Sequence, residues 1–144
     1  MAQASPRHSV SVAAAIIDHA GRLLAVRRRD NGHWEPPGGV LELDETIHAG
    51  LVREVHEETG LEVEPDALTG IYKNMRRGII ALVFRCRIVG GEPGATTEAR
   101  EVAWLTPAEV QERMDEAYAT RLLDALQPGP AAIRAHDGLS LLPT

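Results

Sequence analysis

The sequence predicts a single domain of the α/β (α+β) class, in which strands and helices pack in layers. Three observations support this prediction. The chain has 144 residues, which is enough for one compact core and leaves no room for a second. Its composition is 44% apolar and 25% charged, as in globular domains. Strand-like segments come first, then a helical segment, then more strands and a helical end, and this order favours a layered fold.

The first half of the chain predicts a β-hairpin, an irregular loop and a helix. Residues 10–17 are mostly Ala and β-branched, and residues 23–29 form the expected returning strand after a turn at 18–21. The loop that follows is rich in Pro and Gly and ends in Pro37-Gly38-Gly39. Residues 45–59 have apolar side chains at helical spacing, so we expect a helix with Asp44 as its N-cap and Gly60 at its end.

The second half alternates between strands and helices. The expected strands are short segments at 61–63 and 70–74, the longest strand at 79–89, and a last one at 101–105. Two helices are expected, from Pro107 to about Asp115 and from Ala117 to Leu126. The helical pattern is lost in residues 128–144, which form either a loose tail or one that packs back on the domain. We therefore expect one domain over residues 1–144, with its core at about 10–126.

Composition excludes several classes of protein. The net charge of −6 argues against a protein that binds long nucleic acid, which needs a basic face. No apolar run approaches the roughly 20 residues of a membrane helix, and the first ten residues lack the apolar stretch of a secretory signal. The single cysteine, Cys86, excludes an internal disulfide and a cysteine cluster for zinc. A cytoplasmic location is the simplest expectation.

Three carboxylates share one face of the expected helix. Glu54, Glu57 and Glu58 fall within an arc of about 100° at helical spacing. Like charges at this spacing destabilise a bare helix by a few tenths of a kcal/mol per pair. A hard divalent cation such as Mg²⁺ would offset that repulsion, because it prefers oxygen ligands and often bridges carboxylates to phosphates. An ordinary solvated acidic face is the alternative interpretation.

The segment around these glutamates resembles the Nudix box. That motif is Gly, five residues, Glu, seven residues, then Arg-Glu-apolar-any-Glu-Glu-any-Gly-apolar. The match is complete from Gly39 to Leu61, and the preceding Trp34 and Pro37-Gly38-Gly39 are similar to the approach to the box in this family. The chain is thus identified as a member of the Nudix hydrolase family, and its small size is similar to that of the MutT-like members. The matching charged and glycine positions are Gly39, Glu45, Arg53, Glu54, Glu57, Glu58 and Gly60.

The resemblance implies an α/β/α sandwich with a mixed sheet, and hydrolysis of a nucleoside diphosphate linked to another group. It implies Mg²⁺ as cofactor, with Mn²⁺ as a possible substitute, because divalent ions neutralise phosphate oxygens and activate water. The implied metal ligands are Glu57 and Glu58, with Glu54 as a further ligand and a backbone carbonyl from Gly38 or Gly39. Arg53 is expected to pair with Glu45 or Glu54 and to orient that carboxylate.

A carboxylate must also accept the proton of the attacking water. Members of the family use either a box glutamate or one from a later loop. Glu57 or Glu58 is the first candidate here and Glu98 the next, while Glu101 lies close to Glu98 in the sequence. Ordinary solvated loop acids are the competing interpretation of Glu98 and Glu101.

Substrate contacts are expected from a few side chains near the box. Strand alternation places Arg28 on the opposite face from Arg27 and Arg29, so Arg28 is a candidate for gripping phosphate. Arg77, with Arg76, could close over phosphates from a neighbouring turn or belong to a plain turn. Trp34 could stack on a base or pack the proline loop.

The substrate expected from the resemblance is a (deoxy)nucleoside triphosphate or a related diphosphate. A nucleotide sugar is a further candidate. A non-catalytic module that senses nucleotides is the alternative from a different class, although such modules often lose box glutamates and sit beside a DNA-binding domain. Isomerase chemistry on an isoprenoid diphosphate is a third possibility. Small members of the family are often dimers, so a homodimer is possible.

Overall fold

The computed structural model describes residues 4–144. Within them the chain forms nine strands and three helices. The strands are β1 (Ser9–Ile16), β2 (Leu23–Arg28), β3 (Trp34–Glu35), β4 (Gly38–Val40), β5 (Leu61–Asn74), β6 (Ile79–Gly91), β7 (Ala99–Leu105), β8 (Ala132–His136) and β9 (Leu141–Leu142). The helices are α1 (Ile47–Thr59), α2 (Pro107–Arg113) and α3 (Glu116–Asp124).

The strands form two sheets. The larger sheet has the order β4-β1-β6-β5-β8-β9, and the smaller has the order β3-β2-β7. In the larger sheet, β1 runs parallel to β6 and β5 runs parallel to β8, whereas the other pairs are antiparallel. The larger sheet is therefore mixed, as predicted.

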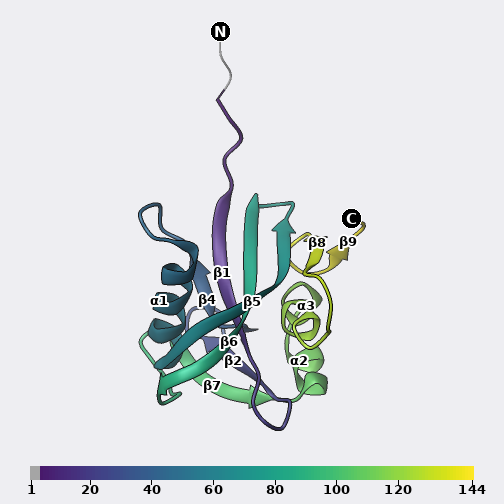
Figure 1. Cartoon of the computed structure of the whole chain (residues 1–144). Helices are drawn as coiled ribbons and strands as arrows, with labels where there is room; N and C mark the ends of the chain where they lie inside the picture. The colour runs from purple at the N-terminus through teal and green to yellow at the C-terminus, as the bar shows by residue number, and fades with distance from the viewer. Residues whose placement is uncertain (1–3) are drawn as a thin grey trace.

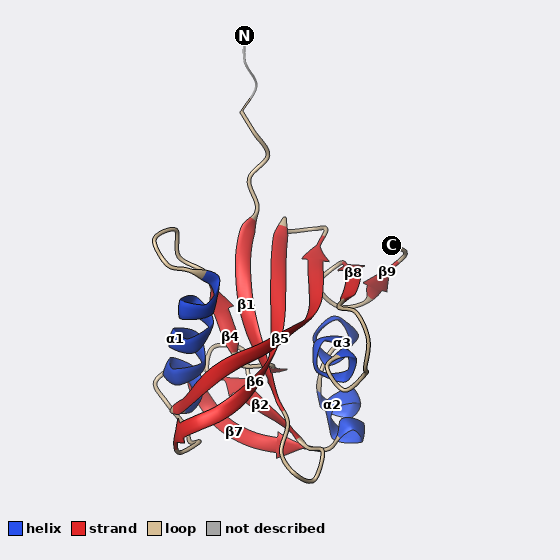
Figure 2. Cartoon of the chain, in the orientation of Figure 1, coloured by secondary structure: helices blue, strands red, loops and turns tan. Residues whose placement is uncertain are grey.

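The helices cover the strands from two sides, with α1 on one side and α2 and α3 on the other (Figure 1). Colouring by secondary structure shows the same three layers (Figure 2). This arrangement confirms the α/β/α sandwich. The sandwich holds the loop between β4 and α1 at the edge of the strands, where the matched motif lies.

Strand β1 divides the core between the two helical layers. Val12 and Ile16 are buried with Leu51 of α1, while Ala13 is buried in the cluster that contains Leu122 of α3. Successive side chains of a strand point to opposite faces, so an apolar run without alternation is what a strand covered on both sides requires.

The predicted helix begins later than expected. Helix α1 starts at Ile47, and its N-cap is Thr46, whose side chain accepts a hydrogen bond from the Ala49 amide at 3.2 Å. The prediction of Asp44 as the N-cap is therefore wrong. The preceding residues remain in the loop because the Glu45 side chain is used to bond the Glu42 amide and Arg53.

The expected hairpin is wrong, because β1 and β2 belong to different sheets and are joined only by the isolated bridge between Ile17 and Leu23. The expected irregular loop is also wrong in part, since it contains the short strands β3 and β4.

Two expectations for the second half of the chain change as well. The predicted strands at 61–63 and 70–74 are parts of one long strand, β5, whose register against β6 shifts near Pro65, a residue without an amide donor for the ladder. The segment 128–144 packs back on the domain, since β8 pairs with β5 and the Arg134 guanidinium bonds both oxygens of Asp124 at 2.7 Å. The domain thus extends beyond the expected core at 10–126. Residues 1–3 of the predicted domain lie outside the described residues.

No helix in residues 4–144 is both long enough and apolar enough to cross a membrane.

Candidate active site

Helix α1 is fixed at both ends and along one face. Leu51 is fully buried against the strands. The Thr46 side chain caps the first turn, and Gly60 ends the helix with φ of 81°, in the left-handed region that favours glycine. These contacts set the direction of the remaining face, which carries Glu54 and Glu57.

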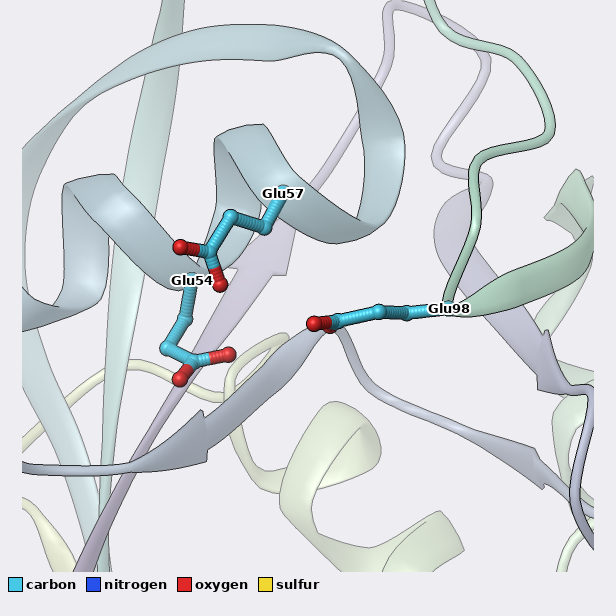
Figure 3. A group of neighbouring side chains, drawn as sticks. All are labelled: Glu54, Glu57 and Glu98. Carbon is cyan, nitrogen blue, oxygen red and sulfur yellow. The ribbon is translucent and has the colours of Figure 1, made fainter.

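Three carboxylates from two distant parts of the chain meet at this face. Glu54 and Glu57 lie on α1, and Glu98 lies just before β7 (Figure 3). Each offers an oxygen, and these oxygens all lie within 4.8 Å of one another. Glu57 and Glu98 are exposed, so the cluster is accessible from solvent. Glu98, the second candidate for the base, thus lies among the box carboxylates.

A tight turn holds Glu98 in place. The Thr96 hydroxyl accepts hydrogen bonds from the amides of Glu98 and Ala99 at 3.2 and 3.1 Å. Arg29 anchors the same turn, because its amide donates to the Glu98 carbonyl at 3.3 Å and its Nε donates to the Thr96 carbonyl at 2.9 Å. The turn after β2 therefore positions a carboxylate of the cluster.

The guanidinium group of Arg53 donates hydrogen bonds to several glutamates of the motif. Its Nη2 donates to Glu45 Oε1 at 2.6 Å and its Nη1 donates to Glu54 Oε1 at 2.9 Å. Nη1 also lies 3.3 Å from Glu57 Oε2. The hydrogen bond from Arg53 lowers the pKa of Glu45 to about 2. Arg53 thus pairs with both Glu45 and Glu54, the two glutamates that the sequence offered as alternative partners.

Glu58, a predicted metal ligand, is not one of these three carboxylates, and its side chain bonds the glycine loop, which contains Gly38 and Gly39. Its Oε1 accepts a hydrogen bond from the Gly38 amide at 2.9 Å, and the residue is only 5% exposed. Burial raises the pKa of Glu58 to about 8, and the nearby carboxylate of Glu54 adds to this rise. Burial likewise raises the pKa of Glu54, against the opposing effect of Arg53. Two of the box glutamates are thus poorly solvated in the absence of a cation.

Both glycines of the pair lie directly against neighbouring groups. A Cβ on Gly38 would collide with the backbone of β1 at Val12, and a Cβ on Gly39 would collide with the Glu54 carboxylate. Because Gly39 lacks that atom, the backbone of β4 lies directly against Glu54. The predicted backbone ligand and one predicted carboxylate ligand are therefore neighbours.

The donor set fits a hard divalent cation. Glu54, Glu57 and Glu98 supply only carboxylate oxygens, and this set is suited to Mg²⁺ or Mn²⁺. The elevated pKa of Glu54 indicates a carboxylate whose charge is incompletely compensated by Arg53 alone. A cation at this position would supply the missing compensation.

A cleft of about 610 Å³ adjoins the cluster, and its volume is typical of a small-molecule site. Gly38 and Gly39 line it and contact Glu58 and Glu54, whereas Glu54, Glu57 and Glu98 do not line it themselves. Arg28 also lines the cleft, whereas neither Arg27 nor Arg29 does.

The other predicted substrate contacts divide into two groups. Arg76 and Arg77 line the cleft, as expected if they contact substrate. Trp34 does not line it. Its ring packs against the core beneath α2 and lies 5.8 Å from the guanidinium carbon of Arg113. Trp34 therefore packs against the core and not only against the proline loop, and its contact with substrate stays a prediction.

Sequence reasoning missed part of the cleft wall. Glu35 of β3, Tyr118 and Arg121 of α3, and the turn at 137–139 all line the cleft. One signal was present in the sequence, because Arg121 interrupts the apolar stripe of α3 between buried Ala117 and Leu122. A cation on the core face of a helix needs a specific reason. The turn at 137–139 carried no such signal.

A model of the NUDIX domain matches residues 7–126. The chain therefore belongs to the NUDIX family, and with that membership the prediction of a pyrophosphohydrolase is confirmed. A "MutT-like protein" from Streptomyces ambofaciens is 59% identical over 142 residues, which cover 99% of this chain and 92% of that protein.

Two other relatives carry the names of different activities. An "ADP-ribose pyrophosphatase" from Methanocaldococcus jannaschii is 34% identical over 65% of this chain and 60% of its own length. A "Putative 8-oxo-dGTP diphosphatase 2" from Mycobacterium tuberculosis is 35% identical over 73% of this chain and 78% of its own length. Among solved structures, the MutT protein from Methanosarcina mazei superposes with a TM-score of 0.71 at 27% identity, covering 84% of this chain and 94% of that one.

Proposed function

We propose that this chain is a Mg²⁺-dependent pyrophosphohydrolase acting on a (deoxy)nucleoside triphosphate or a related nucleoside diphosphate derivative. The observation that carries the proposal is the cluster of Glu54, Glu57 and Glu98 beside a cleft lined by arginines. A diphosphate bridge needs positive charge on both sides, and this arrangement offers a cation site on one side and guanidinium groups on the other.

The glutamates and Arg53 have separate roles in this proposal. Glu54 and Glu57 would hold the cation together with Glu98 or the Gly39 carbonyl, and Glu58 fixes the glycine loop through the Gly38 amide. The cation, when bound, supplies charge neutralisation and a water of lowered pKa. Arg53 keeps the box carboxylates oriented through its bonds to Glu45 and Glu54.

The chain's own groups also bind substrate and accept a proton. Arg28 and Arg77 line the cleft and would contact phosphate oxygens by charge-assisted hydrogen bonds. Glu57 and Glu98 are exposed carboxylates of the cluster, so either can take the proton of the attacking water. We place Glu57 first, in line with the family's use of box glutamates, and Glu98 second.

The relatives support two substrate classes. The name of the mycobacterial relative favours a nucleoside triphosphate, and the name of the archaeal relative favours ADP-ribose. The mycobacterial relative matches more of this chain, and the compact size is similar to that of MutT-like members, so we place the nucleoside triphosphate first. The cytoplasmic location and the homodimer remain predictions.

The test is a panel of substrates with the full chain. The panel contains the common nucleoside and deoxynucleoside triphosphates, ADP-ribose and nucleotide sugars, each with Mg²⁺, with Mn²⁺ and with a chelator. Product masses then show which phosphate bond is cut. The proposal expects cation-dependent release of a nucleoside monophosphate and pyrophosphate from at least one triphosphate. Turnover of ADP-ribose alone would select the second class, and tight binding without any turnover would favour a sensing module.

A further inference from the structure

Arg121 carries a buried positive charge that has no carboxylate partner. The residue lies on α3 and is only 8% exposed, yet it lines the cleft. Among residues 4–144, no carboxylate lies within ion-pair distance of its guanidinium group, and its buried Nε has no hydrogen-bond partner. A buried charge in this condition is costly unless a ligand completes its surroundings.

Aromatic rings hold the guanidinium group in one orientation. Its central carbon lies 4.7 Å from the ring centroid of Tyr118 and 5.6 Å from that of Tyr72. The guanidinium group lies over both rings, and its N–H groups remain for hydrogen bonding. The edge atoms Nη1 and Nη2 are therefore the groups that can meet a ligand.

His136 is a fully buried neighbour of Arg121 and does not line the cleft. Its Nδ1 accepts a hydrogen bond from the Gly138 amide at 2.9 Å. Burial and the neighbouring Arg121 lower the pKa of His136, so the ring is neutral, and its proton is then on Nε2. Nε2 lies 3.3 Å from Arg121 Nη2. His136 therefore offers no acceptor to Arg121 Nη2, and an acceptor oxygen in the cleft could satisfy Arg121.

Glu35 supplies an acceptor on the same cleft. It lines the cleft with Arg121, and its carboxylate lies 3.4 Å from Arg28 Nη1. The charges of Glu35 and Arg121 are close enough to influence each other. The negative charge of Glu58, beside the glycine loop, also helps to raise the pKa of Arg28. Arg28, Glu35 and Arg121 thus line the same cleft as Gly38 and Gly39 of the glycine loop.

We infer that Arg121 and Glu35 bind the edge of a nucleobase on which a carbonyl oxygen lies next to a ring N–H. Guanine, hypoxanthine, uracil and thymine have such an edge, in which the carbonyl accepts and the N–H donates. Adenine and cytosine present the reverse pattern, an amino donor beside a ring nitrogen acceptor. The inference rests on the proposed function, because it deepens the choice of nucleotide at that same site.

The surroundings favour a base edge over a phosphate group here. A phosphate would satisfy Arg121, but the Glu35 carboxylate on the same wall would repel it. A base edge with one acceptor and one donor uses both residues. Leaving buried polar groups unpaired against the wrong base is also how such sites discriminate strongly.

Arg121 contacts a segment beyond the matched family model, and the turn at 137–139 of that segment lines the cleft. The NUDIX model ends at residue 126, whereas His136 belongs to β8. Strand β8 is held by β5, and the Met75 amide donates to the His136 carbonyl at 2.9 Å. Base selectivity is therefore expected to depend on residues that the general fold of the family does not supply.

The first experiment measures kcat/KM for GTP, ATP, UTP and CTP with the full chain. We expect a preference of roughly tenfold or more for GTP over ATP and for UTP over CTP. Arg121→Met should reduce both ratios to within about threefold by lowering turnover of the oxo bases. Arg113→Met is the matched control, since Arg113 is an exposed arginine of α2 outside the cleft, and it should leave both ratios unchanged. Glu35→Gln, which should also shrink both ratios, serves if Arg121→Met fails to fold.

The second experiment needs no turnover. Binding of GMP, AMP, UMP and CMP is measured by calorimetry in the presence of a chelator, with the same variants. A preference for GMP and UMP that Arg121→Met removes would support the inference even if no nucleotide is hydrolysed, in which case only the proposed function fails. Equal binding of all four by the natural chain would overturn the inference. An equal loss for all four in Arg121→Met would also overturn it, since that is the signature of a phosphate contact or of a purely structural role.

Discussion

Glu57 and Glu98 bring carboxylate oxygens to within 4.8 Å of each other, although one lies on α1 and the other in the turn before β7. The helix fixes Glu57 through its caps and apolar face, and Thr96 with Arg29 fixes the turn. Two independent parts of the fold therefore converge on one acidic cluster. Repulsion between the carboxylates has to be offset, and a divalent cation offsets it together with Arg53.

Neutralising either carboxylate should damage catalysis without unfolding the chain. We expect Glu57→Gln and Glu98→Gln each to lower kcat by at least roughly 10²-fold, because each removes a cation ligand or the proton acceptor. Glu112→Gln, at an exposed position of α2, is the matched control and should retain full activity. Steady-state kinetics at saturating Mg²⁺ gives the answer. Full activity in Glu98→Gln would return Glu98 to the status of an ordinary loop acid.

Adding one methyl group at Gly39 should displace a ligand. A Cβ there would collide with the Glu54 carboxylate, so Gly39→Ala is expected to lower kcat/KM by roughly 10²-fold through misplacement of that group. Gly94→Ala is the control, because a Cβ at Gly94 meets nothing within 4 Å. Circular dichroism checks that both variants are folded. Equal activities of the two variants would show that Glu54 can move without consequence.

Arg53 should contribute to stability as well as to orientation. Arg53→Met removes the bonds to Glu45, Glu54 and Glu57 and leaves those carboxylates facing one another. We expect the free energy of unfolding to fall by about 1–3 kcal/mol, the range for hydrogen bonds to charged groups. Urea denaturation in a chelator measures this fall. An unchanged midpoint would mean that the bonds seen around Arg53 contribute nothing to folding.

His136 should make the folded state sensitive to mild acid. Its pKa is lowered in the folded chain by burial and by Arg121, from an ordinary value of 6.5. Above the ordinary value the ring is neutral in both states, and no stability is lost. As the pH falls below it, the unfolded chain binds a proton that the folded chain resists, so stability declines by up to about 1.4 kcal/mol per pH unit until the folded pKa is reached.

The comparison with His136→Leu isolates this effect. Between about pH 7.5 and pH 5.5, the natural chain should lose roughly 1 kcal/mol more stability than the variant. Glu35 works in the opposite direction, because burial raises its pKa, but it is present in both proteins. Urea midpoints at the two pH values test the difference. Parallel pH dependences would mean that His136 titrates normally in the folded chain.

Local features of the sequence predicted much of the fold and the cluster. The helical spacing of Leu51 and Val55 located α1, and the spacing from Gly39 to Leu61 identified the motif, because both are properties of neighbouring residues. The cap was misplaced by two residues, since Asp44 and Thr46 are both good capping residues and only the bonding of Glu45 decides between them.

Long-range contacts account for what could not be predicted. Strand β8 has weak alternation of its own and exists because β5 offers a free edge, with Arg134 bonded to Asp124. Glu98 is placed by Arg29, which lies far away in sequence. Arg121 reaches the cleft only through the packing of α3 against the strands. Such contacts leave no periodic pattern in the sequence.

The most direct test of the central claim is a crystal structure of the full chain with Mn²⁺ and a bound nucleotide, analysed by anomalous scattering. The account predicts an anomalous peak coordinated by Glu54, Glu57 and Glu98 or the Gly39 carbonyl, in contact with a phosphate oxygen of the nucleotide in the cleft. A nucleotide seated in the cleft with no ion at these carboxylates would contradict it.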